Sequence, residues 1–344
     1  MYLSIQYLRG VAALSVVFVH LEFQLKRLGY EGIWPRALEG GVDIFFVISG
    51  FVIWTAAERH SASIGDFAYR RLARIVPLYW LVTSAIVIMA LLMPQLLQST
   101  RFDLNHIIAS YLFLPYEAPN QQLIYPILVA GWTLNYEIFF YAIFALCLAA
   151  PSKIRLALLS TVIVGLTLFG QIANPENTIL RYWCDPIILE FLYGIFAAVL
   201  VRKVPASNAS ALLLAILALL SWLSLTSFNS YMHRAFALGI PAVLLVFAAV
   251  LLERSNHVKR YLWAERLGDS SYALYLTHGI VLSAVTQVWR LLGISNDYLA
   301  AFSVFAILSC VFVGFATYFL IDQPMHKWFR RKPKLTTYPA QPVS

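Results

Sequence analysis

The first apolar stretch of the chain carries two ionisable residues, Arg9 and His20, whose types and spacing suit chemistry. An imidazole exchanges protons near neutral pH, and a guanidinium binds anions. The two residues are 11 positions apart, so a helix would place them on one face with their Cα atoms about 16 Å apart along its axis. The alternative is structural, with an arginine that reaches the membrane surface and a histidine that is hydrogen-bonded in the core.

An acidic residue, Asp43, stands in the second apolar stretch, which reads GVDIFFVISGF over residues 41–51. Asp43, Val47 and Gly50 share one face at helical spacing. Gly50 permits the close approach of a neighbouring helix. We take Asp43 as a functional candidate, and the alternative is that its side chain only caps the start of a helix.

Another acidic residue, Glu137, lies about ten residues from either end of the apolar stretch 127–149. Thr133 and Tyr141 stand four positions before and after it, on the same helical face. A carboxylate at this depth must face the interior of a bundle and find a partner. Glu137 is therefore a functional candidate, with a structural pair to an arginine or a histidine as the alternative.

Polar residues also interrupt two later apolar stretches. Glu190 is followed by Gly194, and Ser271, Tyr275 and His278 share a face at i, i+4 and i+7. Each set is a candidate for function, and the alternative is hydrogen bonding that holds helices together.

Three arginines, Arg70, Arg71 and Arg74, stand on about one helical turn just before an apolar stretch. Guanidinium groups match the geometry of phosphates, so the cluster predicts an anion site. The alternative is an ordinary basic flank on the cytoplasmic side of a membrane span.

Two other sequence patterns are not assigned a chemical function. Cys147, Cys184 and Cys310 are isolated, so neither a disulfide framework nor a zinc site is expected, and no metal-binding spacing is found. The sequence GDSS at 268–271 resembles a motif of SGNH hydrolases, but it stands at the edge of an apolar stretch with no hydrolase domain around it.

The elements that must position these residues are membrane helices. Of the 344 residues, 60% are hydrophobic and 12% are charged, whereas soluble domains carry about 25% charged residues. A spanning helix needs about 20 mostly apolar residues. The sequence predicts an all-α, polytopic membrane bundle with about ten spans, at 4–23, 40–57, 75–93, 127–149, 154–172, 185–201, 210–226, 235–252, 271–292 and 299–321.

The basic residues indicate the orientation of these spans. With ten spans, 17 of the 25 Lys and Arg residues fall on one side and 6 on the other, and the richer side is the cytoplasmic one. Both termini are therefore expected in the cytoplasm. The net charge of +8 comes mostly from these cytoplasmic basic residues, which would face anionic lipid or an anionic ligand. No nucleic acid is therefore expected as a partner.

Taken together, these sequence segments resemble those of a known protein family. Arg9 with ten residues before His20 resembles the R-x10-H signature of the membrane-bound acyltransferase family 3. The other matching blocks are GVDIFFVISGF at 41–51, YRRLARIVPLYW at 69–80, WTLNYEIFFY at 132–141, EFLYG at 190–194, SYALYLTH at 271–278 and DQP at 322–324. One departure is Asp322, where the family usually has a glutamate. The chain looks most like the stand-alone members that decorate bacterial exopolysaccharide.

The resemblance implies one acyltransferase domain over residues 1–332. The segment 333–344 is polar and contains prolines, so we expect it to be a disordered cytoplasmic tail. The resemblance also implies O-acylation, usually acetylation, of a sugar hydroxyl. The donor would be cytoplasmic acyl-CoA, normally acetyl-CoA, and no metal would be needed. The acceptor would be a surface glycan or its lipid-linked precursor at the bacterial cytoplasmic membrane, and the oligomeric state is left open.

The layout of the residues, joined with the resemblance, suggests a role for each candidate. His20 would be the general base, with Glu137 or Asp43 as the carboxylate that orients it, and a covalent acyl-histidine is an alternative route. Arg9 would guide the arm of the donor, whose phosphates would be held by Arg70, Arg71 and Arg74. The residues expected to line the substrate channel are Ser49, Trp132, Thr133, Glu190, Tyr275 and His278; of these, Tyr275 and His278 are also candidates to donate to the thioester oxygen.

Two other classes of membrane protein compete with an acyltransferase. A glycan transporter also buries charges in a bundle of many spans, but we find no inverted repeat of the sort that many transporters have. A scaffold in an export complex would not need Arg9, His20 and Glu137 in its interior.

Overall fold

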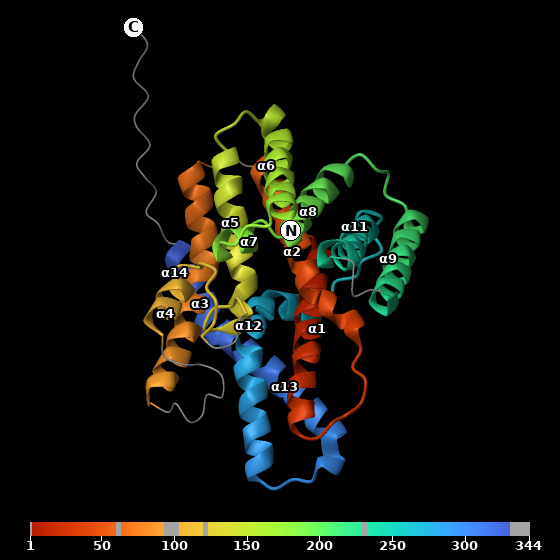
Figure 1. Ribbon diagram of the computed structural model, residues 1–344. Coiled ribbons are helices and arrows are strands. Elements are labelled where there is room, and N and C mark those ends of the chain that lie inside the picture. Colours follow the sequence, from red (N-terminus) through yellow and green to blue (C-terminus); the bar gives the residue numbers. More distant parts are fainter. Residues whose placement is uncertain (1, 60–62, 93–102, 120–122, 229–232, 331–344) are drawn as a thin grey trace.

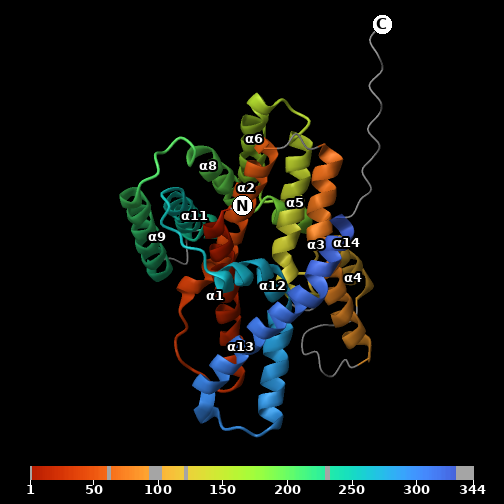
Figure 2. The same cartoon turned by 180° about the vertical axis from the view of Figure 1, so that it is seen from behind.

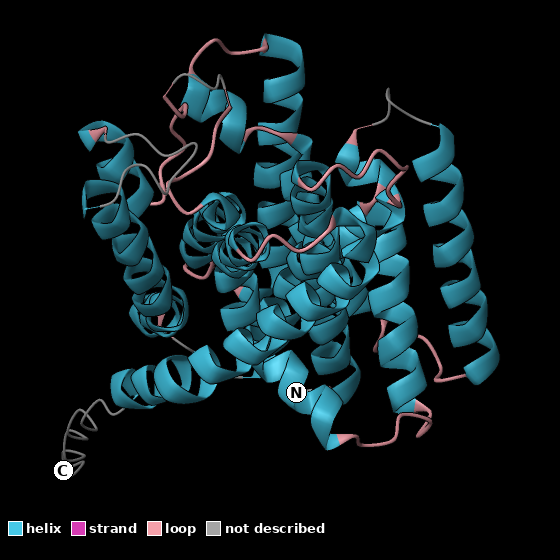
Figure 3. Cartoon of the chain, turned by 90° about the horizontal axis from the view of Figure 1, so that it is seen from below, coloured by secondary structure: helices cyan, strands magenta, loops and turns pink. Residues whose placement is uncertain are grey.

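The computed structural model describes residues 2–59, 63–92, 103–119, 123–228 and 233–330 (Figure 1). The described chain is helical, with loops only between helices (Figure 3), and its β-structure is a single bridge between Glu117 and Ile124. The helices are α1 (Leu3–Arg27), η1 (Arg36–Gly40), α2 (Gly41–Arg59), α3 (Ile64–Leu92), α4 (Leu104–Tyr111), η3 (Val129–Gly131), α5 (Trp132–Cys147), α6 (Ser152–Ala173), α7 (Thr178–Trp183), η4 (Pro186–Ile188), α8 (Leu189–Leu200), α9 (Asn208–Phe228), α10 (Arg234–Ala237), α11 (Gly239–Arg254), α12 (Leu262–Leu291), η5 (Asn296–Tyr298), α13 (Leu299–Thr317), η6 (Tyr318–Asp322) and α14 (Gln323–Arg330).

Eight helical segments of the described chain are long and apolar enough to cross a membrane, which confirms an all-α, polytopic bundle. They are Leu3–Arg27, Leu38–Glu58, Ile64–Leu92, Val129–Cys147, Ser152–Ala173, Thr178–Leu200, Arg234–Arg254 and Leu299–Phe329. The two other expected spans fall on α9, which contributes only a shorter apolar stretch, and on the 30-residue α12, which is not among the eight. The expected tail at 333–344 lies outside the described residues.

Two helices begin earlier than the apolar stretches alone indicated. α3 starts at Ile64 rather than near residue 75, so Arg70, Arg71 and Arg74 lie on the N-terminal turns of a membrane helix. α12 starts at Leu262 rather than near residue 271, so the GDSS sequence lies inside a helix instead of at its edge.

Helix α2 lies in the middle of the bundle. Of its most apolar 18 residues, 67% are buried inside the protein, against 17% for α6 at the periphery. α9 lies at one edge beside α11 (Figures 1 and 2). The polar residues of α2 are therefore surrounded by other helices, whereas α6 presents most of its apolar side chains outward.

Close contact between α2 and α8 depends on two glycines. A Cβ atom on Gly50 would collide with the backbone carbonyl of Phe191, and one on Gly194 would collide with the carbonyl of Val47. Each glycine thus faces the backbone of the other helix, as in the small-residue contacts of membrane helices. The predicted close approach at Gly50 is confirmed.

Helices α1, α12 and α13 pack together in a second group, apart from the contact between α2 and α8. Side chains of α1 at i, i+4 and i+8 face α12 and α13 in an apolar cluster of Ala13, Val17, Leu21, Leu25, Leu28, Leu274, Leu282, Phe302, Ala306 and Cys310. α12 changes direction after its first turns (Figures 1 and 2). Ser270 and Ser271 donate hydrogen bonds to the carbonyls of Leu267 and Gly268 in this region, a pattern that favours helix bending.

We expect replacement of Gly50 by valine to destabilise the protein, because the added atoms would overlap a backbone carbonyl that cannot move without α8. Overpacking of this kind costs about 1–3 kcal/mol, which thermal unfolding of the purified protein would detect. Gly165→Val is the matched control, since a Cβ on Gly165 meets nothing within 4 Å. Equal stability of the two variants would contradict the close contact.

Candidate active site

His20 of α1 and His278 of α12 face each other across the contact between the two helices. Their ring centroids are 4.9 Å apart, with the planes at 67°. His278 is buried and His20 is half-buried. The sequence singled out both histidines, but only the packing of α12 on α1 makes them a pair.

Backbone carbonyls fix the tautomer of both rings. His20 Nδ1 lies 2.8 Å from the carbonyl oxygen of Val16, and His278 Nδ1 lies 2.6 Å from that of Tyr275. A carbonyl only accepts hydrogen bonds, so each Nδ1 carries the proton in the neutral ring. Each Nε2 then holds a lone pair, and neither has a hydrogen-bond partner in the described part of the chain.

Neither candidate carboxylate hydrogen-bonds to His20, contrary to the expectation that Glu137 or Asp43 would orient the ring. The carbonyl of Val16, one turn earlier in α1, occupies Nδ1 instead. A backbone oxygen is available to any helical histidine that turns toward the preceding turn, so this contact needs no tertiary partner. His278 likewise has no free N–H in its neutral form, so it could donate to a thioester oxygen only when protonated.

Glu137 of α5 forms a separate polar group with α2 and α3. Its Oε1 accepts hydrogen bonds from Ser49 Oγ, at 3.0 Å, and from the hydroxyl of Tyr141. The guanidinium of Arg71 lies 5.9 Å from the centre of the Tyr141 ring and 5.7 Å from that of Phe67. The expected i, i+4 pairing of Glu137 with Tyr141 is thus observed, and one arginine of the α3 cluster lies over the ring of that tyrosine.

The arginines of α3 do not lie together in one environment. Arg71 and Arg74 are half-buried, whereas Arg70 is exposed. Arg74 lies within electrostatic reach of Arg9 and of Asp322. Asp322 ends η6, a π-helical turn, and such turns often occur at functional sites.

Arg9 of α1 extends toward the same region. Its Nη1 donates to Gln6 Oε1 at 3.3 Å. The side chain lies within electrostatic reach of Arg74, Glu137 and Asp269. Arg9, Arg71, Arg74 and Glu137 therefore form one polar cluster, which we call the arginine cluster, nearer the start of α1 than His20.

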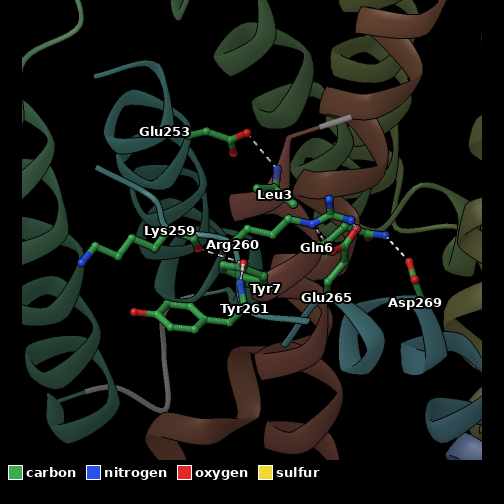
Figure 4. A network of polar contacts seen from close by, with 9 residues as sticks. All are labelled: Leu3, Gln6, Tyr7, Glu253, Lys259, Arg260, Tyr261, Glu265 and Asp269. Atoms are coloured by element: carbon green, nitrogen blue, oxygen red, sulfur yellow. Dashed lines mark hydrogen bonds and ion pairs between the residues drawn. The ribbon is translucent and has the colours of Figure 1, made fainter. Parts of the chain in front are cut away.

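The beginning of α1 is anchored to α11 and α12 by polar contacts (Figure 4). Glu253 of α11 accepts hydrogen bonds from the backbone N–H groups of Leu3 and Ser4, at 2.9 and 2.7 Å, and so caps α1 from a neighbouring helix. The hydroxyl of Tyr7 donates to the carbonyl of Lys259 and accepts from the N–H of Tyr261. These contacts hold the turns that carry Gln6 and Arg9.

Asp43 pairs with an arginine that the sequence did not single out. Arg234 Nε and Nη2 donate to the two carboxylate oxygens of Asp43 at 3.0 and 2.6 Å, and Nη2 also donates to the carbonyl of Glu39. Asp43 is fully buried, and Arg234 is 31% exposed. Glu190, also fully buried, lies against Asp43 and the guanidinium of Arg234. The positions are typical of a structural ion pair between helices rather than of a partner for His20.

The remaining channel candidates, Thr133, Tyr275 and Trp132, lie on α5 and α12. Thr133 Oγ1 and the hydroxyl of Tyr275 are 2.9 Å apart, and the Tyr275 ring contacts the rings of Phe45 and His278. Trp132 packs edge-on against Phe46 and Tyr136. Tyr275 thus links α5 to the histidine pair.

Some residues of the site were missed from the sequence. Gln6, Asp269 and Arg234 carry polar contacts to the candidates, but they stand at the edges of apolar stretches, where polar residues are common. In the described part of the chain, no group of three or more His, Cys, Asp or Glu side chains is placed to hold a metal ion.

Comparisons with known proteins show the family of the chain. An acyltransferase domain model, acyltransferase 3, matches residues 2–321. The chain is 34% identical to the exopolysaccharide production protein ExoZ of Rhizobium meliloti, over 83% of this chain and 88% of that protein. It is 27% identical to the acyltransferase MdmB of Streptomyces mycarofaciens, over 98% and 94% of the two chains. It is 23% identical to the peptidoglycan O-acetyltransferase OatA of Listeria monocytogenes, over 83% of this chain and 50% of that protein. No solved structure matches the chain.

The apolar helices and the domain match define a multi-pass membrane enzyme that transfers acyl groups. The chain belongs to the acyltransferase 3 family. This membership favours an acyltransferase over the transporter and the scaffold that the sequence left as alternatives.

We expect Asp43→Asn to lower the stability of the protein, because it leaves the guanidinium of Arg234 without its charged partner. Breaking a buried ion pair costs about 3–5 kcal/mol, measurable as a lower Tm and a lower yield of folded protein. Glu58→Gln is the control: the Glu58 carboxylate pairs with Arg202 at 2.5 Å, but both side chains are over a third exposed, so the loss should be under about 1 kcal/mol. A stable but inactive Asp43→Asn protein would instead indicate a catalytic role.

Proposed function

We propose that the enzyme transfers an acyl group, normally acetyl, from cytoplasmic acyl-CoA to a sugar hydroxyl. The acceptor would be an exopolysaccharide, another surface glycan or its lipid-linked precursor, and the enzyme would lie in the bacterial cytoplasmic membrane. The observation that carries the proposal is His20, whose Nδ1 proton is held by a backbone carbonyl while its Nε2 lone pair has no partner in the described chain. The printed names of ExoZ and OatA support a glycan as acceptor.

In the proposed reaction, His20 acts as the general base. Its Nε2 accepts the proton of the sugar hydroxyl as the oxygen attacks the thioester carbonyl. The tetrahedral intermediate then collapses, the C–S bond breaks, and the CoA thiolate takes the proton from the imidazolium. The Val16 carbonyl would keep the ring oriented through both proton transfers, the role that a carboxylate has in many triads.

The arginine cluster would bind the donor. Arg9, Arg71 and Arg74 are half-buried, and none of them forms an ion pair with a carboxylate in the described part of the chain. Guanidinium groups that are partly removed from water and lack a counter-ion favour an external anion. Phosphate groups of acyl-CoA have the required charge.

The length of α1 suits the donor. α1 is one continuous helix from Leu3 to Arg27, so Arg9 and His20 are about 16 Å apart along its axis. An extended pantetheine arm has about this reach, so phosphates held near Arg9 would place the thioester near the histidine pair.

The basic residues support an orientation with the start of α1 toward the cytoplasm. The N-terminal turns of α1, α3 and α12 carry Arg9, Arg70, Arg71, Arg74 and Arg266. Basic residues on the ends of spans favour the cytoplasmic side, which is where acyl-CoA is found. Both chain ends would then be cytoplasmic, and residues 1–332 would form one domain.

We expect His20→Ala to abolish transfer, because it removes the half-buried imidazole that would take the hydroxyl proton, and the neighbouring His278 is buried. Loss of a general base lowers the rate by about 10²–10⁴-fold. The measurement is O-acetylation of glycan in membranes that contain equal amounts of each protein. His257→Ala is the control, since His257 is exposed and bonds to Asn208 and Ser255 away from the site. Normal acetylation by the His20→Ala protein would show that His20 is not the general base.

We expect Arg71→Gln and Arg74→Gln to weaken acetyl-CoA binding by about tenfold or more each, the effect of losing a charge-assisted hydrogen bond. Binding to the purified protein would be measured by titration calorimetry. Arg70→Gln should have a smaller effect because Arg70 is exposed. Arg202→Gln, at the paired surface arginine, is the control; unchanged affinity in all four variants would reduce the cluster to a determinant of topology.

A further inference from the structure

Arg9 is held by a neutral side chain and not by a carboxylate. A guanidinium has five N–H donors, and within the described residues Arg9 donates one hydrogen bond, from Nη1 to Gln6 Oε1 at 3.3 Å. Its other N–H groups and its positive charge are left without a direct protein partner.

The orientation of the Gln6 amide is set from the other side. Gln6 Nε2 donates to Asp269 Oδ1 at 2.5 Å (Figure 4). A carboxylate only accepts, so the NH₂ end of the amide must face Asp269 and the carbonyl end must face Arg9. Asp269 thus decides that Arg9 meets an acceptor rather than two competing donors.

The backbones at this point cannot shift easily. A Cβ on Gly268, the residue before Asp269, would overlap the carbonyl of Gln6. A Cβ on Gly10, the residue after Arg9, would come within 3.0 Å of the Leu267 side chain. Glycines on both helices therefore fix the distance across which the Gln6 amide acts.

The contrast with Arg234 shows what this arrangement does. Arg234 forms two hydrogen bonds to the carboxylate of Asp43, so its charge is neutralised by direct contact. Asp269 also lies within electrostatic reach of Arg9, yet the Gln6 amide stands between them. An uncharged bridge fixes the position of the guanidinium without forming an ion pair with it.

We propose that Gln6 and Asp269 are positioning residues, which orient Arg9 through a neutral bridge and leave its charge for an anionic or carbonyl oxygen of the acyl donor. The inference rests on the proposed function, since it takes Arg9 as a donor-binding residue. It gives a role to the GDSS sequence, whose aspartate lies inside α12 against α1.

The test moves the carboxylate without changing the composition of the bridge. In the double variant Gln6→Glu with Asp269→Asn, side-chain size, total charge and the number of hydrogen bonds are kept, because the asparagine amide can donate to the new carboxylate. The negative charge now touches Arg9 directly. We expect the dissociation constant for acetyl-CoA, measured on the purified full-length protein, to rise about tenfold or more, while Tm stays close to that of the wild type.

Two controls test the single changes separately: the loss of the Asp269 charge, and a Gln→Glu change beside a different arginine. Asp269→Asn alone keeps an oxygen that accepts from Gln6, so we expect acetyl-CoA affinity within about twofold of the wild type, since a neutral amide oxygen replaces the carboxylate as acceptor and Arg9 keeps its own contact with Gln6. Gln24→Glu is the matched control, because Arg27 Nη1 donates to Gln24 Oε1 at 3.3 Å with the same i, i+3 spacing on the same helix. This variant should bind acetyl-CoA normally.

If the double variant is poorly folded, Asp269→Leu replaces it: the amide of Gln6 is then free to turn its NH₂ group toward Arg9, and acetyl-CoA affinity should again fall about tenfold. Normal affinity in the double variant, or an equal loss in Asp269→Asn, overturns the bridge. If His20→Ala abolishes transfer in that case, the proposed function stands. If the wild-type protein binds no acetyl-CoA, both the proposed acyl donor and the proposed role of Gln6 and Asp269 are wrong.

Discussion

The contact between α1 and α12 is the constraint on which the site depends. At its beginning, glycines bring the two backbones close enough for Gln6 to reach Asp269. Further along, the same pair of helices sets His20 against His278. In lipid, helices gain little from burying apolar side chains, so association relies on close packing and polar contacts. A single interface therefore fixes both the cation that would meet the donor and the base that would activate the acceptor.

The buried charges of the molecule fall into two kinds. Asp43 and Arg234 satisfy each other directly and link helix α2 to the segment before α11. Arg9, Arg71 and Arg74 have no such partner among the described residues, and Glu137 is bound by two hydroxyl groups instead of by a cation. Charges of the first kind hold a fold together, and charges of the second kind are available to a ligand. This difference separates the ion pair between Asp43 and Arg234 from the arginines that we propose bind the donor.

The histidine pair differs from the usual arrangement of a catalytic imidazole. A carboxylate that orients a histidine also stabilises its cation, whereas the carbonyl of Val16 supplies a dipole without a full charge. The carbonyl therefore orients the ring and leaves the Nε2 lone pair free to accept a proton. His278 brings a second neutral ring to the same place, held in the same way by its own helix.

The sequence by itself determined that the chain is an all-α membrane bundle, because apolar stretches of about 20 residues have no other stable form in lipid. It also selected Arg9, His20, Asp43 and Glu137, because charged side chains within such stretches are rare enough to be noticed. Pairings within one helix, such as that of Glu137 with Tyr141, followed from the helical period.

Only the tertiary structure decided the partners across helices. Asp43 meets Arg234 and not His20, His20 meets His278, and Gln6 meets Asp269 across 263 positions of sequence. Which face of a membrane helix meets which neighbour depends on close backbone approach at particular glycines and on the bend of a helix. These contacts join residues far apart in the chain, and the periodicity of a single helix carries no information about them.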